Sequence, residues 1–390
     1  MKKILFVIPS SQIGGVTTSL CSIIDYFKNS DYYIRIFATT HQQGCEISYK
    51  NLLLPEDELL SSYWCVYNRE TPRRKLKFLG MKILKQLTLR FGWSLEDWLF
   101  IRAIKRIESK YQFDTIVAFS EGDTTKFVSY STYPNKIAWI HSNYVVSFPD
   151  STFNESSIFN KFNTIVNVSK YTNSCFINRY PSLENKCTAI YNLLDTDRIN
   201  RLSKEKIIDN RFNNLKEDFV VLSVGRVCKV KQYSKIPEIV SKIKVNHPNI
   251  KWYIIGPLDS DPIEVSLLKE SIEKENVQNN VILLGGQKNP YPYFIQAHLL
   301  VSTSLSEACP MIFNEAKILK LPVVSSDFGS AYEFINDGVD GVITPIDFMS
   351  VQISRLIEDN EFYQNIKNSI RPENIISNNE IVKQISDIFE

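Results

Sequence analysis

Two glutamates have the spacing of a site for a ligand that carries both an anion and hydroxyl groups. Glu307 and Glu315 lie in the stretch S-E-A-C-P-M-I-F-N-E-A-K, with seven residues between them. Because proline suits the first turn of a helix and no later one, we expect a helix to begin at Pro310. Glu307 would then lie in the loop before this helix, and Glu315 about a turn and a half inside it.

The predicted start of this helix is also an anion site. The backbone amides of Met311 and Ile312 would have no partner within the helix, and such amides bind anions. The two carboxylates would accept hydrogen bonds from hydroxyls. A sugar attached to a nucleoside diphosphate carries the matching groups. The alternative is that Glu307 and Glu315 are ordinary solvent-facing carboxylates, and their placement around Pro310 favours the first interpretation.

Two cations follow another predicted strand, Phe219 to Val224. Arg226 comes directly after Gly225 in the sequence, and Lys231 lies five residues further on. A guanidinium grips a diphosphate through two donors, and an ammonium adds a compact positive charge. Taken alone, a pair of solvated surface cations explains these two residues equally well.

A histidine and a pair of glycines follow strands in the first half of the chain. His141 comes directly after a predicted strand, Lys136 to Ile140. A lone histidine is usually structural, but ligand sites of α/β proteins form at the carboxyl ends of strands, which favours a role at a site. Gly14 and Gly15 allow close backbone approach to a ligand, although a tight turn explains them equally well. They do not form the G-x-G-x-x-G fingerprint, which argues against an NAD enzyme.

The composition is that of an ordinary globular protein. A chain of 390 residues is too long for one typical core, so two domains are expected. Its 44% hydrophobic and 23% charged residues fit a globular protein, and its net charge of +2 gives no general case for nucleic-acid binding. Neither a Walker loop, a zinc motif, a kinase set nor a Ser-His-Asp order is found. We therefore expect neither a metal nor a bound cofactor.

The location of the protein is predicted from three features. The apolar run near the N-terminus is too short for a signal peptide, and no apolar window of 18 residues predicts a membrane-spanning helix. The seven cysteines have no metal-like spacing. Without an export signal, we expect them to be reduced thiols in the cytoplasm.

Strand-like and helix-like segments alternate along the whole chain, which predicts a mostly parallel sheet with helices on both faces in each half. The predicted strands are Lys2–Pro9, Tyr33–Ala38, Phe113–Phe119, Lys136–Ile140, Phe162–Asn167, Cys187–Tyr191, Phe219–Val224, Ile250–Gly256, Val281–Leu284, His298–Val301, Leu321–Ser325 and Gly341–Thr344. Helices are predicted after Gly15, over Ser94–Tyr111, Ser234–Asn246 and Asp261–Glu275, from about Pro292, and over Asp347–Asn368 and Glu380–Phe389.

The segment Arg73 to Trp93 has seven basic residues and no acidic one. Its apolar residues form two stripes at helical spacing. One interpretation is a helix that packs on both faces, with its lysines in solvent. The other is that the second stripe and its lysines lie on an anionic membrane surface.

Taken together, these features resemble the retaining glycosyltransferases of family 4. Their B-type fold has two Rossmann-like domains with mostly parallel sheets that face each other across a cleft. The resemblance covers nearly the whole chain, from the Gly14–Gly15 loop to the G-V-D-G turn that ends at Gly341. Its most specific parts are Gly225-Arg226 with Lys231, and the two glutamates in order and register.

The resemblance implies a role for each candidate residue. In that family the arginine and lysine hold the diphosphate of the donor, the second glutamate takes the ribose hydroxyls, and the first contacts the donor sugar. The glycine loop faces the donor, and the matched histidine lies near the transferred sugar. The implied catalytic residues are His141, Arg226, Lys231 and Glu307, and the implied donor-binding residues are Gly14, Gly15, Gly225, Arg226, Lys231, Pro310, Met311, Ile312 and Glu315.

The sequence departs from the family pattern at two places. Ala308-Cys309-Pro310 stands where the family often has Gly-Phe-Gly, at backbone that contacts the donor, so the identity of the donor is left open. Gln232 stands where a glycine usually follows the lysine.

The polar stretch Thr196 to Lys216 has no strong period and is predicted to be the domain linker. We expect an acceptor-side Rossmann-like domain at residues 1–200, a domain that binds the nucleotide sugar at 201–370, and a helical tail at 371–390.

The resemblance implies a transferase that acts with retention and without a metal. It would move a sugar from a nucleotide-diphosphate sugar to a hydroxyl of a glycan or lipid-linked oligosaccharide, in bacterial capsule, O-antigen or exopolysaccharide synthesis. The protein would be cytoplasmic and peripheral at the inner face of the membrane. The alternatives are a nucleotide-sugar epimerase of the same fold and a non-catalytic subunit that binds nucleotide sugars.

Overall fold

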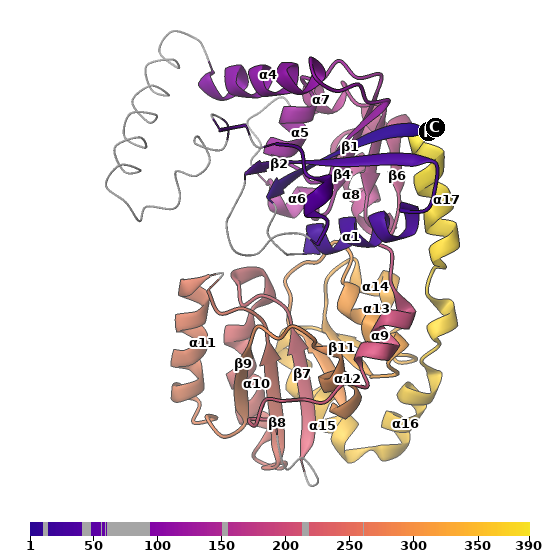
Figure 1. Cartoon of the computed structure of the whole chain (residues 1–390). Coiled ribbons are helices and arrows are strands. Elements are labelled where there is room, and N and C mark those ends of the chain that lie inside the picture. Colours follow the sequence, from indigo (N-terminus) through magenta and orange to yellow (C-terminus); the bar gives the residue numbers. More distant parts are fainter. Residues whose placement is uncertain are drawn as a thin grey trace. The chain divides into compact units, whose positions relative to one another are not determined.

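The computed structural model describes residues 1–10, 15–40, 48–55, 57–58, 60, 94–149, 155–212, 218–259 and 261–390. It contains two compact units (Figure 1). The first unit comprises Met1–Leu194 and Ser377–Glu390, and the second comprises Asp195–Ile376. The basic segment Arg73 to Trp93 and Gly14 lie outside the described residues.

The first unit is built on a six-stranded parallel sheet, ordered β2-β1-β3-β4-β5-β6. The inner strand β1 contains an uninterrupted apolar run, Ile4 to Ile8, whose residues are fully buried, as expected for a strand covered on both faces. The strands are β1 (Lys2–Ser10), β2 (Tyr32–Thr40), β3 (Thr115–Ala118), β4 (Asn135–Ile140), β5 (Thr164–Asn167) and β6 (Cys187–Ala189).

Helices cover both faces of this sheet, as the alternating pattern predicts. Leu5 and Val7 pack in the main core with residues of α4, α5, α7 and α8. Phe6, on the opposite face of β1, contacts Phe389 of α17. The helices are α1 (Gly15–Phe27), α4 (Leu95–Glu108), α5 (Asp123–Val128), α6 (Tyr144–Ser147), α7 (Glu155–Phe159), α8 (Lys170–Arg179) and α17 (Asn378–Phe389), with 3₁₀ helices at Lys50–Leu52 and Pro181–Lys186.

The second unit has its own six-stranded parallel sheet, ordered β12-β11-β10-β7-β8-β9. Because these strands run in one direction, their carboxyl ends and the loops that follow meet at one edge of the sheet. The strands are β7 (Phe219–Val224), β8 (Ile250–Ile255), β9 (Val281–Gly285), β10 (Leu299–Ser302), β11 (Val323–Ser326) and β12 (Val342–Thr344).

The helices predicted in the second unit are present, and one of them is divided in two. The predicted helix Asp347–Asn368 is divided at Asp359, whose side chain accepts a hydrogen bond from the Phe362 amide (2.9 Å) and caps the second part. The helices are α9 (Thr196–Leu202), α10 (Ile236–Ile243), α11 (Pro262–Lys274), α12 (Tyr291–Gln296), α13 (Met311–Ile318), α14 (Ala331–Phe334), α15 (Met349–Glu358) and α16 (Asn360–Ser369). Short 3₁₀ helices span Lys229–Lys231, Tyr233–Lys235, Ile346–Phe348 and Pro372–Asn374.

The predicted linker from Thr196 to Lys216 is not a linker over its first part. Asp195 accepts a hydrogen bond from the Arg198 amide (2.8 Å) and caps α9, which packs against α12 and α13 of the second unit. The second unit thus begins at Asp195, before the expected boundary at residues 200 and 201. The apolar period was missing because α9 is short and buries only Ile199.

The residues expected to form a separate tail, 371–390, are divided between the two units. Helix α17 belongs to the first unit (yellow in Figure 1), where the fully buried ring of Phe389 packs against Phe6, Phe27 and Tyr32. The Lys2 ammonium donates to the carbonyl of Phe389 (2.9 Å). The C-terminal helix is therefore part of the first core. In the described part of the chain, no helix has both the length and the apolar character needed to cross a bilayer.

We predict that Phe389→Ala destabilises the first unit. Replacing a fully buried phenylalanine by alanine costs about 3–5 kcal/mol, because packing is lost and a cavity remains. Thermal unfolding followed by circular dichroism should show a clearly lower melting temperature. Phe348→Ala, at a ring that is 60% exposed, is the control and should melt like the wild type. Equal melting of both variants would contradict this account of α17.

Candidate functional site

The ends of β7 and β8 approach each other closely, which fixes the floor of the candidate site. A Cβ on Gly256 would lie 1.8 Å from the carbonyl oxygen of Gly225, so only glycine fits there. Gly225 itself has φ +151°, in the region that favours glycine. The loop that follows β7 therefore leaves the sheet beside the end of β8.

Lys231 folds back over Gly225. Its Cε would lie 3.1 Å and its Nζ 3.4 Å from a Cβ on Gly225, so a side chain at Gly225 would crowd the ammonium group. The Thr303 hydroxyl donates to the Lys231 carbonyl (2.6 Å) and ties this loop to the end of β10. The next residue, Gln232, has φ 51°, a left-handed conformation. This explains why glycine would suit the position where the sequence departs from the family pattern.

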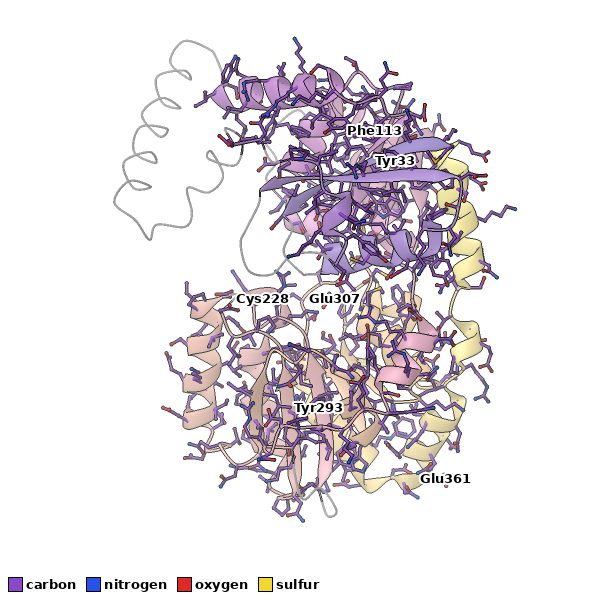
Figure 2. The ribbon with its side chains drawn as sticks, in the orientation of Figure 1. Tyr33, Phe113, Cys228, Tyr293, Glu307 and Glu361 are labelled. Atoms are coloured by element: carbon purple, nitrogen blue, oxygen red, sulfur yellow. The ribbon has the colours of Figure 1, made fainter. Side chains whose placement is uncertain are left out.

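Lys231 and Glu307 form a hydrogen-bonded ion pair through Nζ and Oε1. Both side chains are mostly shielded from solvent. The Ser304 hydroxyl donates to the same Oε1 (2.7 Å), and the Ser330 hydroxyl donates to the Glu307 carbonyl (2.6 Å). Both side-chain contacts fall on Oε1, so Oε2 keeps no such contact with the described residues. Figure 2 shows Glu307 at the same end of the second unit as Cys228 of the loop after β7, and Glu361 at the opposite end.

The predicted helix start is confirmed. Helix α13 begins at Met311 after Pro310, and the Phe313 amide donates to the Pro310 carbonyl (3.0 Å). The amides of Met311 and Ile312 precede this bond and are the first of the helix, so they point out of its N-terminus. As predicted, Glu307 lies in the loop before α13 and Glu315 lies within it.

Glu315 lies half-buried and accepts a hydrogen bond from the Tyr291 hydroxyl (3.2 Å). Burial raises the pKa of Glu315 to about 7, and the hydrogen bond from Tyr291 opposes this rise. Burial, and then the neighbouring charge of Glu315, raise the pKa of Tyr291. Tyr291 was not singled out in the sequence, where the only signal is a tyrosine at the start of a predicted helix.

A buried ion pair holds the other end of α13. The Lys317 ammonium donates to Asp340 Oδ2 (2.9 Å), and Asp340 Oδ1 accepts a hydrogen bond from the Asn336 amide (2.8 Å). Asp340 belongs to the turn from Gly338 to Gly341. The turn at which the family resemblance ends is therefore a support for the helix that carries Glu315.

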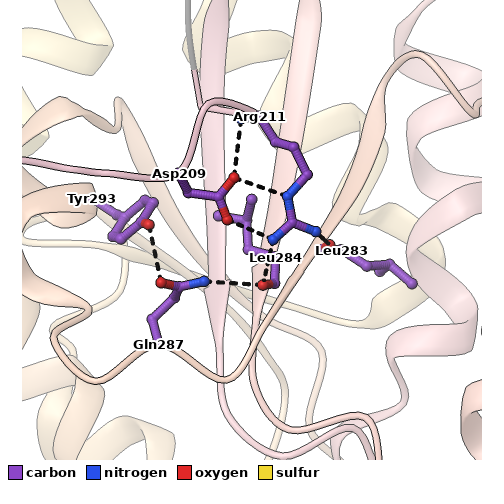
Figure 3. A network of polar contacts seen from close by, with 6 residues as sticks. All are labelled: Asp209, Arg211, Leu283, Leu284, Gln287 and Tyr293. Carbon is purple, nitrogen blue, oxygen red and sulfur yellow. Dashed lines mark hydrogen bonds and ion pairs between the residues drawn. The ribbon is translucent and has the colours of Figure 1, made fainter.

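A polar network holds the loop after β9 (Figure 3). The Arg211 guanidinium donates to the carbonyls of Leu283 (2.8 Å) and Leu284 (2.9 Å), and Asp209 accepts from its Nε (2.9 Å). The Gln287 amide donates to the same Leu284 carbonyl (3.0 Å). Since β9 is the last strand in the order of the sheet, Arg211 covers backbone groups of an edge strand.

The structure does not bring every candidate into contact. The Arg226 side chain is exposed at the end of β7 and makes no hydrogen bond or ion pair with the described residues. Gly15 is the first residue of α1, and no described atom would lie within 4 Å of a Cβ there, so packing does not require a glycine. Gly14 lies outside the described residues.

His141 follows β4 in the first unit, as predicted. Its ring packs edge-on against Phe119 (centroids 4.5 Å apart) and lies nearly parallel to the ring of Trp139 (centroids 6.4 Å apart). Its Nε2 is buried and has no hydrogen-bond partner among the described residues. Burial lowers the pKa of His141 to about 3, so the imidazole is neutral at physiological pH. A neutral ring with one unused nitrogen can exchange a hydrogen bond with a hydroxyl.

In the described ranges, no group of three or more His, Cys, Asp or Glu side chains is arranged to hold a metal ion. What the second unit offers at the carboxyl edge of its sheet is one exposed guanidinium, an ammonium paired with a carboxylate, a helix N-terminus, and a second carboxylate within that helix. Such a set can bind a polyanion and several hydroxyls.

Residues 204–372 match the family model described as Glycosyl transferases group 1. The second unit belongs to this family. The match names no numbered family, so membership of family 4 stays a prediction. The group 1 unit carries Arg226, Lys231, Glu307 and Glu315, which all lie within the matched residues.

Two relatives and a solved structure extend the comparison. The uncharacterized glycosyltransferase MJ1059 of Methanocaldococcus jannaschii is 32% identical over 197 residues, 49% of this chain and 48% of that protein. The N-acetylgalactosamine-N,N'-diacetylbacillosaminyl-diphospho-undecaprenol 4-alpha-N-acetylgalactosaminyltransferase of Campylobacter jejuni is 24% identical over 304 residues, 76% of each chain. The chain thus spans about half the length of the first relative and three quarters of the second.

The crystal structure of Anabaena Alr3699/HepE in complex with UDP and glucose aligns with 99% of both chains, at a TM-score of 0.74 and 17% identity. This likeness, with the two six-stranded parallel sheets, confirms the predicted fold class, two Rossmann-like units of the B-type glycosyltransferase fold.

Burial of Glu315 predicts how stability depends on pH. A carboxyl whose pKa is raised by folding binds its proton more tightly in the folded state, so stability falls as pH rises from about 4.5 to about 7 and then stays lower. Glu315→Gln removes this loss. We expect the variant to gain about 1–3 kcal/mol over the wild type at pH 8 and little at pH 5.

Urea unfolding at the two pH values measures this difference. Glu361→Gln, on the exposed surface of α16, is the matched control and should show no such change between pH 5 and 8. An equal effect of Glu315→Gln at both pH values would mean that its carboxyl is not destabilised by burial.

The left-handed conformation of Gln232 gives a second prediction. A β-branched residue pays the full steric cost of this conformation, about 1–2 kcal/mol, whereas glycine and asparagine tolerate it. Gln232→Val should therefore lower the free energy of unfolding in urea, and Gln232→Gly and Gln232→Asn should not. If valine proves as stable as asparagine at this position, the backbone is not left-handed there.

Proposed function

We propose that the protein is a retaining, metal-independent glycosyltransferase. It moves a sugar from a nucleotide-diphosphate sugar to a hydroxyl of a glycan or lipid-linked oligosaccharide in bacterial surface polysaccharide synthesis. The observation that carries the proposal is the grouping of Lys231 and Glu307 with the helix start at Met311 and Ile312, and with Glu315 on the same helix.

Each part of the donor has a matching group in the second unit. Lys231 and the first amides of α13 suit the diphosphate, and the exposed guanidinium of Arg226 adds a two-donor contact. Glu315 suits the ribose hydroxyls. Glu307 keeps Oε2 for a sugar hydroxyl while Lys231 and Ser304 hold Oε1.

The comparisons support the classes of donor and acceptor. The name of the Campylobacter relative describes a sugar acceptor joined through a diphosphate to undecaprenol, and the Anabaena structure holds UDP and glucose. We therefore favour a uridine or guanosine diphosphate sugar as donor and a lipid-linked acceptor.

In the proposed mechanism, the bond between the anomeric carbon and the diphosphate oxygen breaks, and its electron pair goes to the leaving diphosphate. Arg226, Lys231 and the amides of Met311 and Ile312 stabilise that charge. The acceptor hydroxyl attacks from the same face and passes its proton to the departing phosphate oxygen. The new bond forms on the face that the old bond left, so the configuration is retained.

A covalent route would need a free carboxylate nucleophile on the opposite face of the sugar. Among the described residues, none nominates itself for that role, and we assign Glu307, which Lys231 and Ser304 hold through Oε1, to a hydroxyl of the donor sugar instead. We assign to the neutral ring of His141, in the first unit, a hydrogen bond with the transferred sugar. This role of His141 follows from the resemblance to the family 4 glycosyltransferases. On the same resemblance, we assign acceptor binding to the first unit.

Removal of the cations tests the proposal. Loss of one preorganised donor that stabilises developing charge lowers kcat by about 10²–10³-fold, so Arg226→Ala and Lys231→Ala should each reduce transfer on this scale. Transfer is measured with radiolabelled UDP- and GDP-sugars and membrane extracts that supply the acceptor. Lys229→Ala, an exposed lysine of the same loop, should keep wild-type transfer.

The alternatives have distinct outcomes. Full transfer by Arg226→Ala and Lys231→Ala would favour a non-catalytic subunit that binds nucleotide sugars. Conversion of the donor without any acceptor would favour an epimerase.

Cytoplasmic location and contact of Arg73 to Trp93 with an anionic membrane are further proposals from the sequence. Flotation with anionic vesicles tests the membrane contact. The Lys75/Lys82/Lys85→Glu variant should float less than the wild type, and equal flotation would contradict the proposed contact.

A further inference from the structure

Tyr291 makes a contact that the proposed function does not explain by itself. Its hydroxyl, at the first position of α12, donates to Oε1 of Glu315 on α13 (3.2 Å). Both side chains are half-buried. A tyrosine hydroxyl in such a place usually has a partner, and here that partner is the carboxylate assigned to the ribose.

We propose that Tyr291 is a positioning residue, which orients the Glu315 carboxylate toward the ribose hydroxyls of the donor and keeps it ready to accept their hydrogen bonds. This inference rests on the proposed function. With Oε1 fixed by Tyr291, the carboxylate plane is set, and Oε2 together with the second lone pair of Oε1 is left for the ribose 2′- and 3′-hydroxyls.

Tyr291 is itself fixed from a second direction. Asn289 Oδ1 accepts a hydrogen bond from the Tyr291 amide (3.1 Å). The Asn289 side-chain amide donates to the Leu202 carbonyl at the end of α9 (2.8 Å) and to Glu205 Oε2 (2.8 Å). The loop before α12 is thereby tied to the segment after α9. A hydroxyl on a helix start held in this way has little freedom to leave Glu315.

The charged groups around Glu315 leave Tyr291 as its polar partner among the described residues. At the start of α9, the charge of Arg198 lowers the pKa of Tyr291 and the charge of Asp195 raises it. On α13, Lys317 is paired with Asp340. In the adjacent 3₁₀ helix Pro372–Asn374, Glu373 faces Arg371 (3.9 Å). The hydrogen bond from Tyr291 is what favours the ionised form of Glu315 against burial.

Loss of the Tyr291 hydroxyl should therefore have two effects. The carboxylate loses its fixed orientation, and its pKa rises further because burial is no longer opposed. At neutral pH more of Glu315 is then protonated and cannot accept hydrogen bonds from two hydroxyls. Binding of a ribonucleotide should weaken, and the pH below which binding fails should move upward.

The test is calorimetric binding of UDP and GDP, and of their 2′-deoxy analogues, to the full-length wild type and to Tyr291→Phe between pH 6 and pH 9. A hydrogen bond to a charged group corresponds to a change of about tenfold in affinity. We expect the variant to bind the ribonucleotide about tenfold more weakly at pH 7. As the pH is lowered, the variant should lose binding at a higher pH than the wild type does. With the 2′-deoxy analogue, the two proteins should differ much less.

Tyr293→Phe is the matched control. Tyr293 lies on the same helix, but its hydroxyl donates to Gln287 (3.3 Å) and not to Glu315. It should leave the pH profile of binding unchanged. In a Glu315→Gln background, Tyr291→Phe should also cause no shift along the pH axis, because the group that titrates is absent. Both comparisons separate positioning from a general loss of folding.

Three results would overturn the inference. One is an unchanged affinity and pH profile in Tyr291→Phe. Another is an equal loss of ribonucleotide and 2′-deoxynucleotide binding, which would indicate damage to the fold. The third is a wild type that binds neither UDP nor GDP, which would overturn the proposed function as well and so can be told apart from the first two.

Discussion

The candidate site depends on one ion pair, between Lys231 and Glu307, whose partners are 76 residues apart in the sequence. They meet because β7 and β10 are neighbours in the sheet of the second unit, and each residue lies in the loop that follows its strand. The other contacts support this pair. Gly225 leaves space for the ammonium group, Thr303 anchors the backbone of Lys231, and Ser304 and Ser330 hold Glu307. Without a shared strand direction, none of these loops would meet.

The second glutamate illustrates a conflict between stability and function. A carboxyl within a helix is costly to bury, and the raised pKa of Glu315 records that cost. The surrounding structure accommodates it with a tyrosine hydroxyl and supports the helix elsewhere, through the buried pair of Lys317 and Asp340. Functional groups are commonly held in such unfavourable settings, because a ligand must find them partly desolvated.

The sequence predicted the features that are local in the chain. Pro310 fixed the start of α13, and buried apolar runs identified the strands, since each depends on neighbours a few residues away. It did not predict the partners that come from other elements. The sequence around Tyr291 does not indicate a contact with Glu315. The helix α9 lacks an apolar period because it is short and buries little. Arg211 was absorbed into a supposed linker because the strand edge that it covers lies 72 residues further along the chain.

The path of the chain through the two units has a consequence for synthesis. The second unit is inserted between two parts of the first, and α17, which follows the second unit in the sequence, completes the first core with Phe389. Because a ribosome makes α17 after the whole second unit, the face of β1 around Phe6 lacks the ring of Phe389 while the second unit emerges. A nascent chain would therefore finish its second unit before its first, and would depend on residues made after the second unit to shield a surface made before it.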